Sequence, residues 1–137
     1  MPAKAVAAKS SSPGEVFDQV ESLLKRYSPP FAVGPGANVG TKRHYDLISR
    51  KEVVIAGKAR TEVWFASVIE QKNYIGFYYM PVYMAPAAIR GKISPRLLKL
   101  LKGKSCFYLK SVDHEVLADI KAALDLGMKH YREQGWL

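Results

Sequence analysis

The sequence contains one cysteine, few histidines and no long hydrophobic run. Cys106 cannot form an internal disulfide, and its neighbours Phe107 and Tyr108 predict a small buried thiol of a reducing compartment. No stretch approaches the roughly eighteen apolar residues of a membrane helix, and residues 1–12 lack the apolar core of a secretory signal. We therefore expect a cytoplasmic protein with a disordered tail over 1–12 and a single domain over 13–137.

The sequence also lacks residues in a pattern that dictates a reaction. His44, His114 and His130 are far apart, and none belongs to a pair with metal-ligand spacing on one helix face. Ser111 and Asp113 precede His114 directly, but neighbours in sequence at a helix start do not have the geometry of a catalytic triad. These patterns predict a protein that is not an enzyme.

A glycine-rich segment, Phe31 to Thr41, contains a partial phosphate-loop pattern. In Gly40-Thr41-Lys42 the threonine and the lysine stand in the wrong order, and a strand-like segment follows in place of a helix. We therefore expect an ordinary surface loop here.

Helical and alternating apolar patterns predict an α+β protein. Ser12-Pro13-Gly14-Glu15 has the residues of a capping box with proline at the first helical position, and Ser28-Pro29-Pro30 stops the helix that follows. Strands are expected at Arg43 to Ile48, Glu52 to Ala56 and Ser105 to Lys110. After the second of these strands, Gly57-Lys58 is expected to turn the chain into a central hairpin. A short helix is expected at Pro95 to Lys102, and a long one from Ser111 or Asp113 to about Gln134.

The centre of the expected sheet is a hairpin of two aromatic-rich strands, Glu62 to Ile69 and Tyr74 to Met80. A polar connection of four residues links the two strands. Strict alternation gives the first run two faces, with Trp64, Ala66 and Val68 on one and Val63, Phe65, Ser67 and Ile69 on the other. Both faces are largely apolar. We therefore expect a central strand in a sheet that is covered on both sides or buried at a subunit contact.

Positive charge is concentrated in the second half of the chain. The formal net charge is +9, and Arg90 to Lys110 holds seven basic residues and no acidic one. The candidate anion-binding residues are Arg90, Lys92, Arg96, Lys99, Lys102 and Lys104. Three of them, at positions 96, 99 and 102, recur along one side of the expected short helix, with no acid nearby in the sequence.

Tyrosines on the sheet add a second element to this basic surface. Tyr74, Tyr78, Tyr79, Tyr83 and Tyr108 offer ring faces on which unpaired bases can stack. A solvated charged helix and tyrosines packed for stability are the alternative interpretation of the same residues.

Three segments of the sequence resemble the YdhG-like family of domains of unknown function. They are Thr61 to Ala66 (TEVWFA), Gln71 to Pro81 (QKNYIGFYYMP) and Leu101 to Phe107 (LKGKSCF), within a resemblance that spans about Glu15 to Arg132. The resemblance implies a bacterial protein with a frataxin-like fold, in which the first and last helices pack on one face of an antiparallel sheet of about five strands. No residue role comes with the match.

Some members of that family are named iron chaperones, which implies carboxylate ligands on the first helix. Glu15, Asp18 and Glu21 recur every three residues there, although acids near a helix start also stabilise the helix dipole. The sequence therefore predicts a binding domain for an anionic ligand or nucleic acid. The alternatives are weak iron binding and a structural adaptor that forms homo-oligomers through the sheet.

Overall fold

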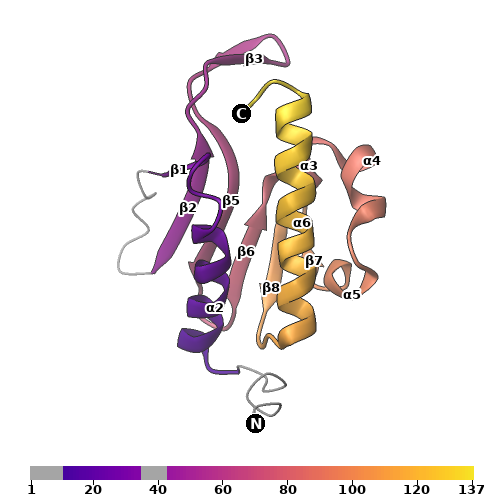
Figure 1. Cartoon of the computed structure of the whole chain (residues 1–137). Coiled ribbons are helices and arrows are strands. Elements are labelled where there is room, and N and C mark those ends of the chain that lie inside the picture. The colour runs from indigo at the N-terminus through magenta and orange to yellow at the C-terminus, as the bar shows by residue number, and fades with distance from the viewer. Residues whose placement is uncertain (1–10, 35–42) are drawn as a thin grey trace.

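An antiparallel sheet carries two long helices on one face (Figure 1). The computed structural model describes residues 11–34 and 43–137. The helices are α2 (Pro13–Lys25), α3 (Met80–Met84), α4 (Pro86–Ile89), α5 (Pro95–Leu98) and α6 (His114–Glu133), with a 3-10 turn η1 (Arg90–Lys92). The strands are β1 (Ala32–Val33), β2 (His44–Ser49), β3 (Val53–Ile55), β4 (Lys58–Arg60), β5 (Val63–Glu70), β6 (Ile75–Tyr79), β7 (Leu101–Lys102) and β8 (Cys106–Leu109).

The main sheet has six strands in the order β1-β2-β5-β6-β8-β7, and β3 and β4 form a separate ribbon. The protein is therefore α+β with helices at both ends of the chain, as the sequence predicts, and its main sheet has one strand more than the five expected. Most of the predicted tail lies outside the described residues, as does most of the loop predicted at Phe31 to Thr41. The described start of that segment is not a surface loop, because Ala32–Val33 pairs with β2 and Phe31 is buried in the core. Where the structure is described, no helix has both the length and the apolar character needed to cross a membrane.

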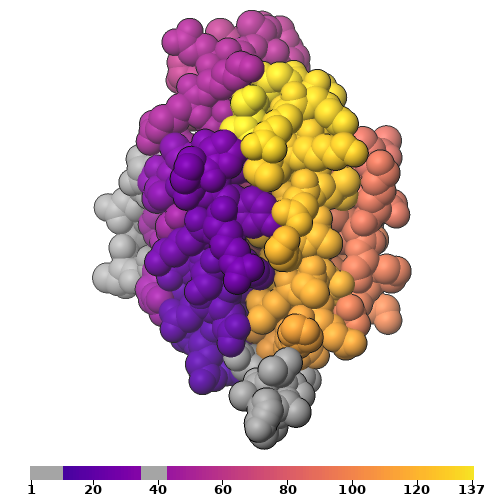
Figure 2. Space-filling view, viewed as in Figure 1, coloured from indigo at the N-terminus to yellow at the C-terminus, as the bar shows by residue number. Residues whose placement is uncertain are grey.

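Helix α2 begins where the sequence predicts. The hydroxyl of Ser12 accepts the backbone N–H of Glu15 at 3.3 Å and donates to the Glu15 carboxylate at 3.1 Å. The helix buries Val16, Val20 and Leu24 against the sheet, and it ends at Lys25. In Figure 2 the two helices α2 and α6 lie side by side over the sheet.

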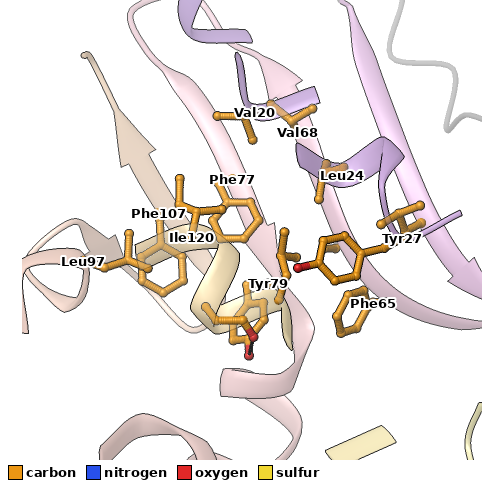
Figure 3. Close-up of a cluster of buried hydrophobic side chains, with 14 of the residues drawn as sticks. Val20, Leu24, Tyr27, Phe65, Val68, Phe77, Tyr79, Leu97, Phe107 and Ile120 are labelled. Atoms are coloured by element: carbon orange, nitrogen blue, oxygen red, sulfur yellow. Dashed lines mark hydrogen bonds between the residues drawn. The ribbon is translucent and has the colours of Figure 1, made fainter. Parts of the chain in front are cut away.

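The predicted central hairpin is confirmed. Strands β5 and β6 pair antiparallel, with Ser67 opposite Tyr78 and Val68 opposite Phe77, and they occupy the middle of the sheet. Helices α2 and α6 then cover one side of this hairpin, and the core lies between them and the strands. Figure 3 shows Leu24 from α2 and Tyr27 from the turn after this helix beside Phe65 and Tyr79 from the sheet.

The predicted faces of β5 are wrong because the strand contains a β-bulge. Leu47 pairs with Ala66 but Ile48 pairs with Trp64, so Phe65 is an extra residue without a partner of its own on β2. The bulge shifts the alternation by one position. The side chains in the core are Val63, Phe65, Ala66 and Val68, which leaves Trp64, Ser67 and Ile69 for the other side of the sheet.

The predicted helix Pro95 to Lys102 is also too long. Helix α5 ends at Leu98, and Leu101 and Lys102 form β7, which pairs with Phe107 and Cys106 of β8. Gly103, with φ +74°, allows the tight turn between the two strands. Helical spacing favoured one continuous helix, but pairing with the sheet edge stabilises a strand instead.

The ribbon of β3 and β4 is a further difference from the expected elements. The sequence places Gly57-Lys58 at the entry to the central hairpin, but Lys58–Arg60 pairs back onto Val53–Ile55. Ala56 and Gly57, with φ of 53° and 79°, make the turn, and two positive φ values in succession are typical of a type I′ hairpin. The ribbon projects beyond the end of the main sheet (Figure 1).

Candidate binding site on the open sheet face

The sheet has a second face, which we call the open face, on the side opposite α2 and α6. Residues paired directly across neighbouring strands share a face, so Ser67, Tyr78 and Cys106 project from the same side of β5, β6 and β8. Tyr108, opposite Gly76, lies on this side as well. Within the described part of the chain, both long helices lie on the other face.

A groove of about 310 Å³ lies on the open face beside α3. Its apolar wall is made by side chains of β5, the end of β6 and α3, namely Trp64, Ile69, Tyr78, Met80, Tyr83 and Met84. Arg60, Glu62 and Ser67 are the charged and hydroxyl-bearing side chains that join the tyrosines in its lining. We call this site the α3 groove.

Tyr78 lies against the sheet because its neighbour on β6 has no side chain. A Cβ atom on Gly76 would lie 2.8 Å from Cε1 of Tyr78, so any larger residue at 76 displaces the ring. Burial raises the pKa of Tyr78, a hydrogen bond with Cys106 raises it further, and the Gln71 amide donates to its hydroxyl at 3.3 Å. The ring therefore has a fixed position from which its other side can contact a ligand.

Cys106 is buried, as predicted, at 8% exposure. Burial raises the pKa of its thiol, so the reactive thiolate form is scarce near neutral pH. The cysteine therefore acts as a packing residue beneath Tyr78.

Two further tyrosines form a stacked pair on the open face. The rings of Tyr74 and Tyr108 lie 3.8 Å apart at an interplanar angle of 10°. A hydrogen bond with Tyr108 raises the pKa of Tyr74, which therefore keeps its proton across the physiological range. Tyr79 differs from the other predicted stacking residues: it is fully buried in the core, where its hydroxyl donates to the carbonyl of Ala123 at 2.5 Å.

Three cations lie beside the aromatic residues of the open face and of the α3 groove. Lys102 pairs with Cys106 and so projects onto the open face, and the Lys104 ammonium lies 5.8 Å from the ring centroid of Tyr83. Arg60 lines the α3 groove. None of the three forms an ion pair with another described residue, which leaves their charges available to an anion.

The expected ridge of basic residues on one helix is wrong, because these residues lie on different elements. Arg96 donates to Asp119 of α6 at 2.7 Å and forms a second ion pair with Glu115 at 3.2 Å, so acids do lie nearby. Lys92 lines a small cavity of about 110 Å³ against Lys129 of α6, on the helix side of the molecule. Only Lys102 and Lys104 of the predicted set are placed by pairing or ring contact beside the open face.

The remaining members of that set are exposed at the edge of the molecule. Arg90 begins η1 and Lys99 follows α5, and both side chains are accessible to solvent. An anion-binding role for the six residues stays a prediction. The members of the set that lie beside aromatic residues, Lys102 and Lys104, are next to the sheet and not on the short helix.

The carboxylates predicted for iron are engaged in other contacts. Asp18 accepts from the Arg43 guanidinium at 2.7 Å, Glu21 lies 3.8 Å from the Lys25 ammonium, and Glu15 completes the cap of α2. No group of three histidine, cysteine, aspartate or glutamate side chains within 11–34 and 43–137 is close enough to hold a metal ion. Iron binding stays a prediction.

The histidines also lie apart from one another in the described structure. His44 Nδ1 lies 3.0 Å from a carboxylate oxygen of the buried Asp46. The ring of His130 packs edge-on against that of Trp136, with 5.9 Å between the ring centroids. His114 is exposed in the first turn of α6. These contacts give each histidine a structural environment of its own.

Sequence reasoning missed the groove itself. Arg60, Met80 and Met84 carry no pattern that separates them from ordinary surface or core residues, and Ser67 was assigned to the wrong set of neighbours. The one available signal was that both faces of β5 are largely apolar, which predicted that the second face is covered or in contact with a partner.

No family model, no curated protein sequence and no solved structure matches the chain. The resemblance to the YdhG-like family therefore stays a prediction.

Proposed function

We propose that the protein binds single-stranded nucleic acid across the open face of its sheet. The observation that carries this proposal is the juxtaposition of accessible aromatic rings, Trp64, Tyr78 and Tyr83, with the unpaired cations of the same face. Single strands expose both features that such a surface recognises, since their bases stack on aromatic rings and their phosphates attract cations.

The charge of the molecule supports the same conclusion. A net charge of +9 attracts polyanions in general, whereas the three unpaired cations of the open face can each neutralise a phosphate at a defined place. Counterion release at single strands contributes a slope of about −0.7 in log K against log salt for each phosphate neutralised. Arg60, Lys102 and Lys104 together therefore predict a slope of about −2.

Fluorescence anisotropy with a labelled single-stranded oligonucleotide tests the proposal. The double variant Lys102→Gln/Lys104→Gln removes two open-face charges, and Lys92→Gln/Lys129→Gln removes two from the helix side, so net charge changes equally. We expect the first variant to weaken binding about tenfold or more and to reduce the salt slope by about 1.4, because two phosphate contacts are lost. The second variant should change affinity by no more than about twofold.

Equal losses in the two variants would contradict a defined site and indicate attraction by net charge alone. Absence of binding at low salt would reject the proposal outright. Light scattering gives a complementary result: a mass of twice the monomer's 15.3 kDa, with no oligonucleotide binding, would favour a homo-oligomer over a nucleic-acid-binding protein.

A further inference from the structure

We infer that the α3 groove holds one unpaired base of the bound strand, an inference that rests on the proposed function. The groove is a concave site beside an otherwise pleated surface, and its lining combines Trp64, Tyr78 and Tyr83. Its volume of about 310 Å³ lies at the lower end of the range of about 300 to 1,000 Å³ that is typical of ligand pockets. A single planar ring system suits a site of this size.

The apolar wall suits a base better than an aliphatic chain. Aromatic rings favour stacking on a flat π-system, and the thioethers of Met80 and Met84 adapt to the edge of a ring through polarisable sulfur contacts. Ser67 contributes a hydroxyl that can donate to or accept from a base edge. A purely hydrophobic ligand would leave this hydroxyl without a partner.

The charges around the groove suit a phosphate next to that base. Glu62 is already paired with Arg50 at 3.6 Å, whereas Arg60 has no acidic partner in the described structure. Arg60 therefore provides a free guanidinium at the groove, and Lys104 provides an ammonium near the ring of Tyr83. A planar guanidinium binds phosphate in a bidentate manner, which fixes the direction in which a strand leaves the groove.

The groove is held in shape from the opposite side of the sheet. The Tyr131 hydroxyl of α6 donates to the carbonyl of Trp64 at 2.6 Å and lies 3.3 Å from the sulfur of Met84. Trp64 stands at the bulge of β5, and bulges are over-represented next to functional sites because they redirect a side chain. Two lining residues thus share one buried anchor, which preorganises the site for a rigid ligand.

Trp64 provides a direct reporter of base insertion. The chain has two tryptophans, and Trp136 packs on Tyr131 at the helix side, so Trp136→Phe leaves Trp64 as the sole indole. In this background the protein is titrated with an oligonucleotide and with a strand of equal length and charge made of abasic residues. We expect the intact strand to quench Trp64 and to bind about tenfold more tightly than the abasic strand, since the loss of base stacking weakens binding.

Two substitutions of exposed residues complete the test. Tyr83→Ala should abolish most of the difference between the intact and abasic strands, because Tyr83 is 49% exposed and its ring stacks without supporting the core. Arg60→Gln should weaken binding of both strands, whereas Lys58→Gln on the same strand but outside the groove should have little effect. Thermal melts of both variants verify that the fold is intact.

The outcomes separate this inference from the proposed function. Binding of the intact and abasic strands with equal affinity, with no change in Trp64 emission, would overturn the base-in-groove inference and leave nucleic-acid binding by the open face in place. Absence of binding of either strand at low salt would overturn both.

Discussion

The hydroxyl of Tyr131 links the helix layer to the open face. This hydroxyl donates to the Trp64 carbonyl at the bulge, and the Tyr131 ring packs edge-on against Phe65 with 5.2 Å between the ring centroids. Burial raises the pKa of Tyr131, so the group remains a donor at any physiological pH. The buried side chain of Tyr131 therefore holds both the bulge of β5 and Trp64, the residue that the bulge turns to the open face.

Substituting Tyr131→Phe should lower the free energy of unfolding by about 1 to 3 kcal/mol, because the change leaves a buried carbonyl without its donor. The control is Tyr27→Phe, which removes a donor from the 51% exposed carboxylate of Asp125 and should cost less, since water can replace the bond. Urea unfolding followed by tryptophan fluorescence measures the free energy of unfolding of both variants. Equal losses would contradict the role assigned to the bulge.

The ion pair between Arg96 and Asp119 makes stability depend on pH. A hydrogen bond from Arg96 holds the pKa of Asp119 below its usual value, so this carboxylate stabilises the fold fully above the unfolded pKa of about 3.9. The contribution is lost as the pH falls through the lower folded pKa. Asp119→Asn should therefore reduce stability at pH 7 and have little effect near pH 2, as urea titrations at several pH values would measure. An equal loss at both pH values would contradict this account.

Individual residues were the least predictable part of the site. The capping residues follow local chemistry: Ser12 caps α2 as predicted, and of the two predicted caps of the last helix, Ser111 and Asp113, the structure has Asp113. Trp64 was placed on the wrong face relative to Ala66, because the bulge depends on how β2 pairs with β5 and no local pattern encodes it. Arg96 was assigned to anion binding because its partner Asp119 lies far away in the sequence.

Helix α6 packs closely on the sheet at Gly127. A Cβ atom there would lie 2.8 Å from Cγ of Pro81, 2.8 Å from the Tyr79 hydroxyl and 2.9 Å from Cε1 of Phe65. The absence of a side chain allows the helix to pack directly on these rings. Glycine inside a helix costs about 1 kcal/mol in propensity, so close packing is what justifies its presence.

We therefore expect Gly127→Ala to destabilise the fold by about 2 kcal/mol, since overpacking against three rigid neighbours exceeds the gain in helix propensity. Gly14→Ala in α2 is the control, because a Cβ there has no neighbour within 4 Å and only the propensity gain remains. Thermal unfolding monitored by circular dichroism compares the two. A stabilising effect of Gly127→Ala would show that the contact relaxes without strain.

The helices and strands differ in how well local patterns predicted them. Helices α2 and α6 and the central hairpin β5-β6 have strong caps or long apolar periods, and all of them form as predicted. The end of α5 and the ribbon β3-β4 were mispredicted, because both depend on pairing between segments that carry no strong periodicity. Short edge strands are therefore where tertiary contacts override local preference.

In the molecule as a unit, the two sides of the sheet have different chemistry. One side is dry and packed by α2 and α6, with cations such as Arg96 and Lys121 engaged in ion pairs on the helices. The other side carries half-buried rings and unpaired cations around a groove. The sequence predicted the layered α+β fold, whereas the class of ligand stays a prediction. Only the folded chain brings Lys102, Lys104 and Arg60 beside the aromatic residues, by strand pairing, by a ring contact and by the groove lining respectively.

The most direct test of the open face as a binding surface is an amide nitrogen–proton NMR titration with a short single-stranded oligonucleotide. We predict saturable shifts in the amides of Trp64, Ser67, Tyr78 and Lys104, with little change along α2 and the exposed side of α6. Shifts concentrated around Lys92 and Lys129, or spread evenly over every basic residue, would contradict it.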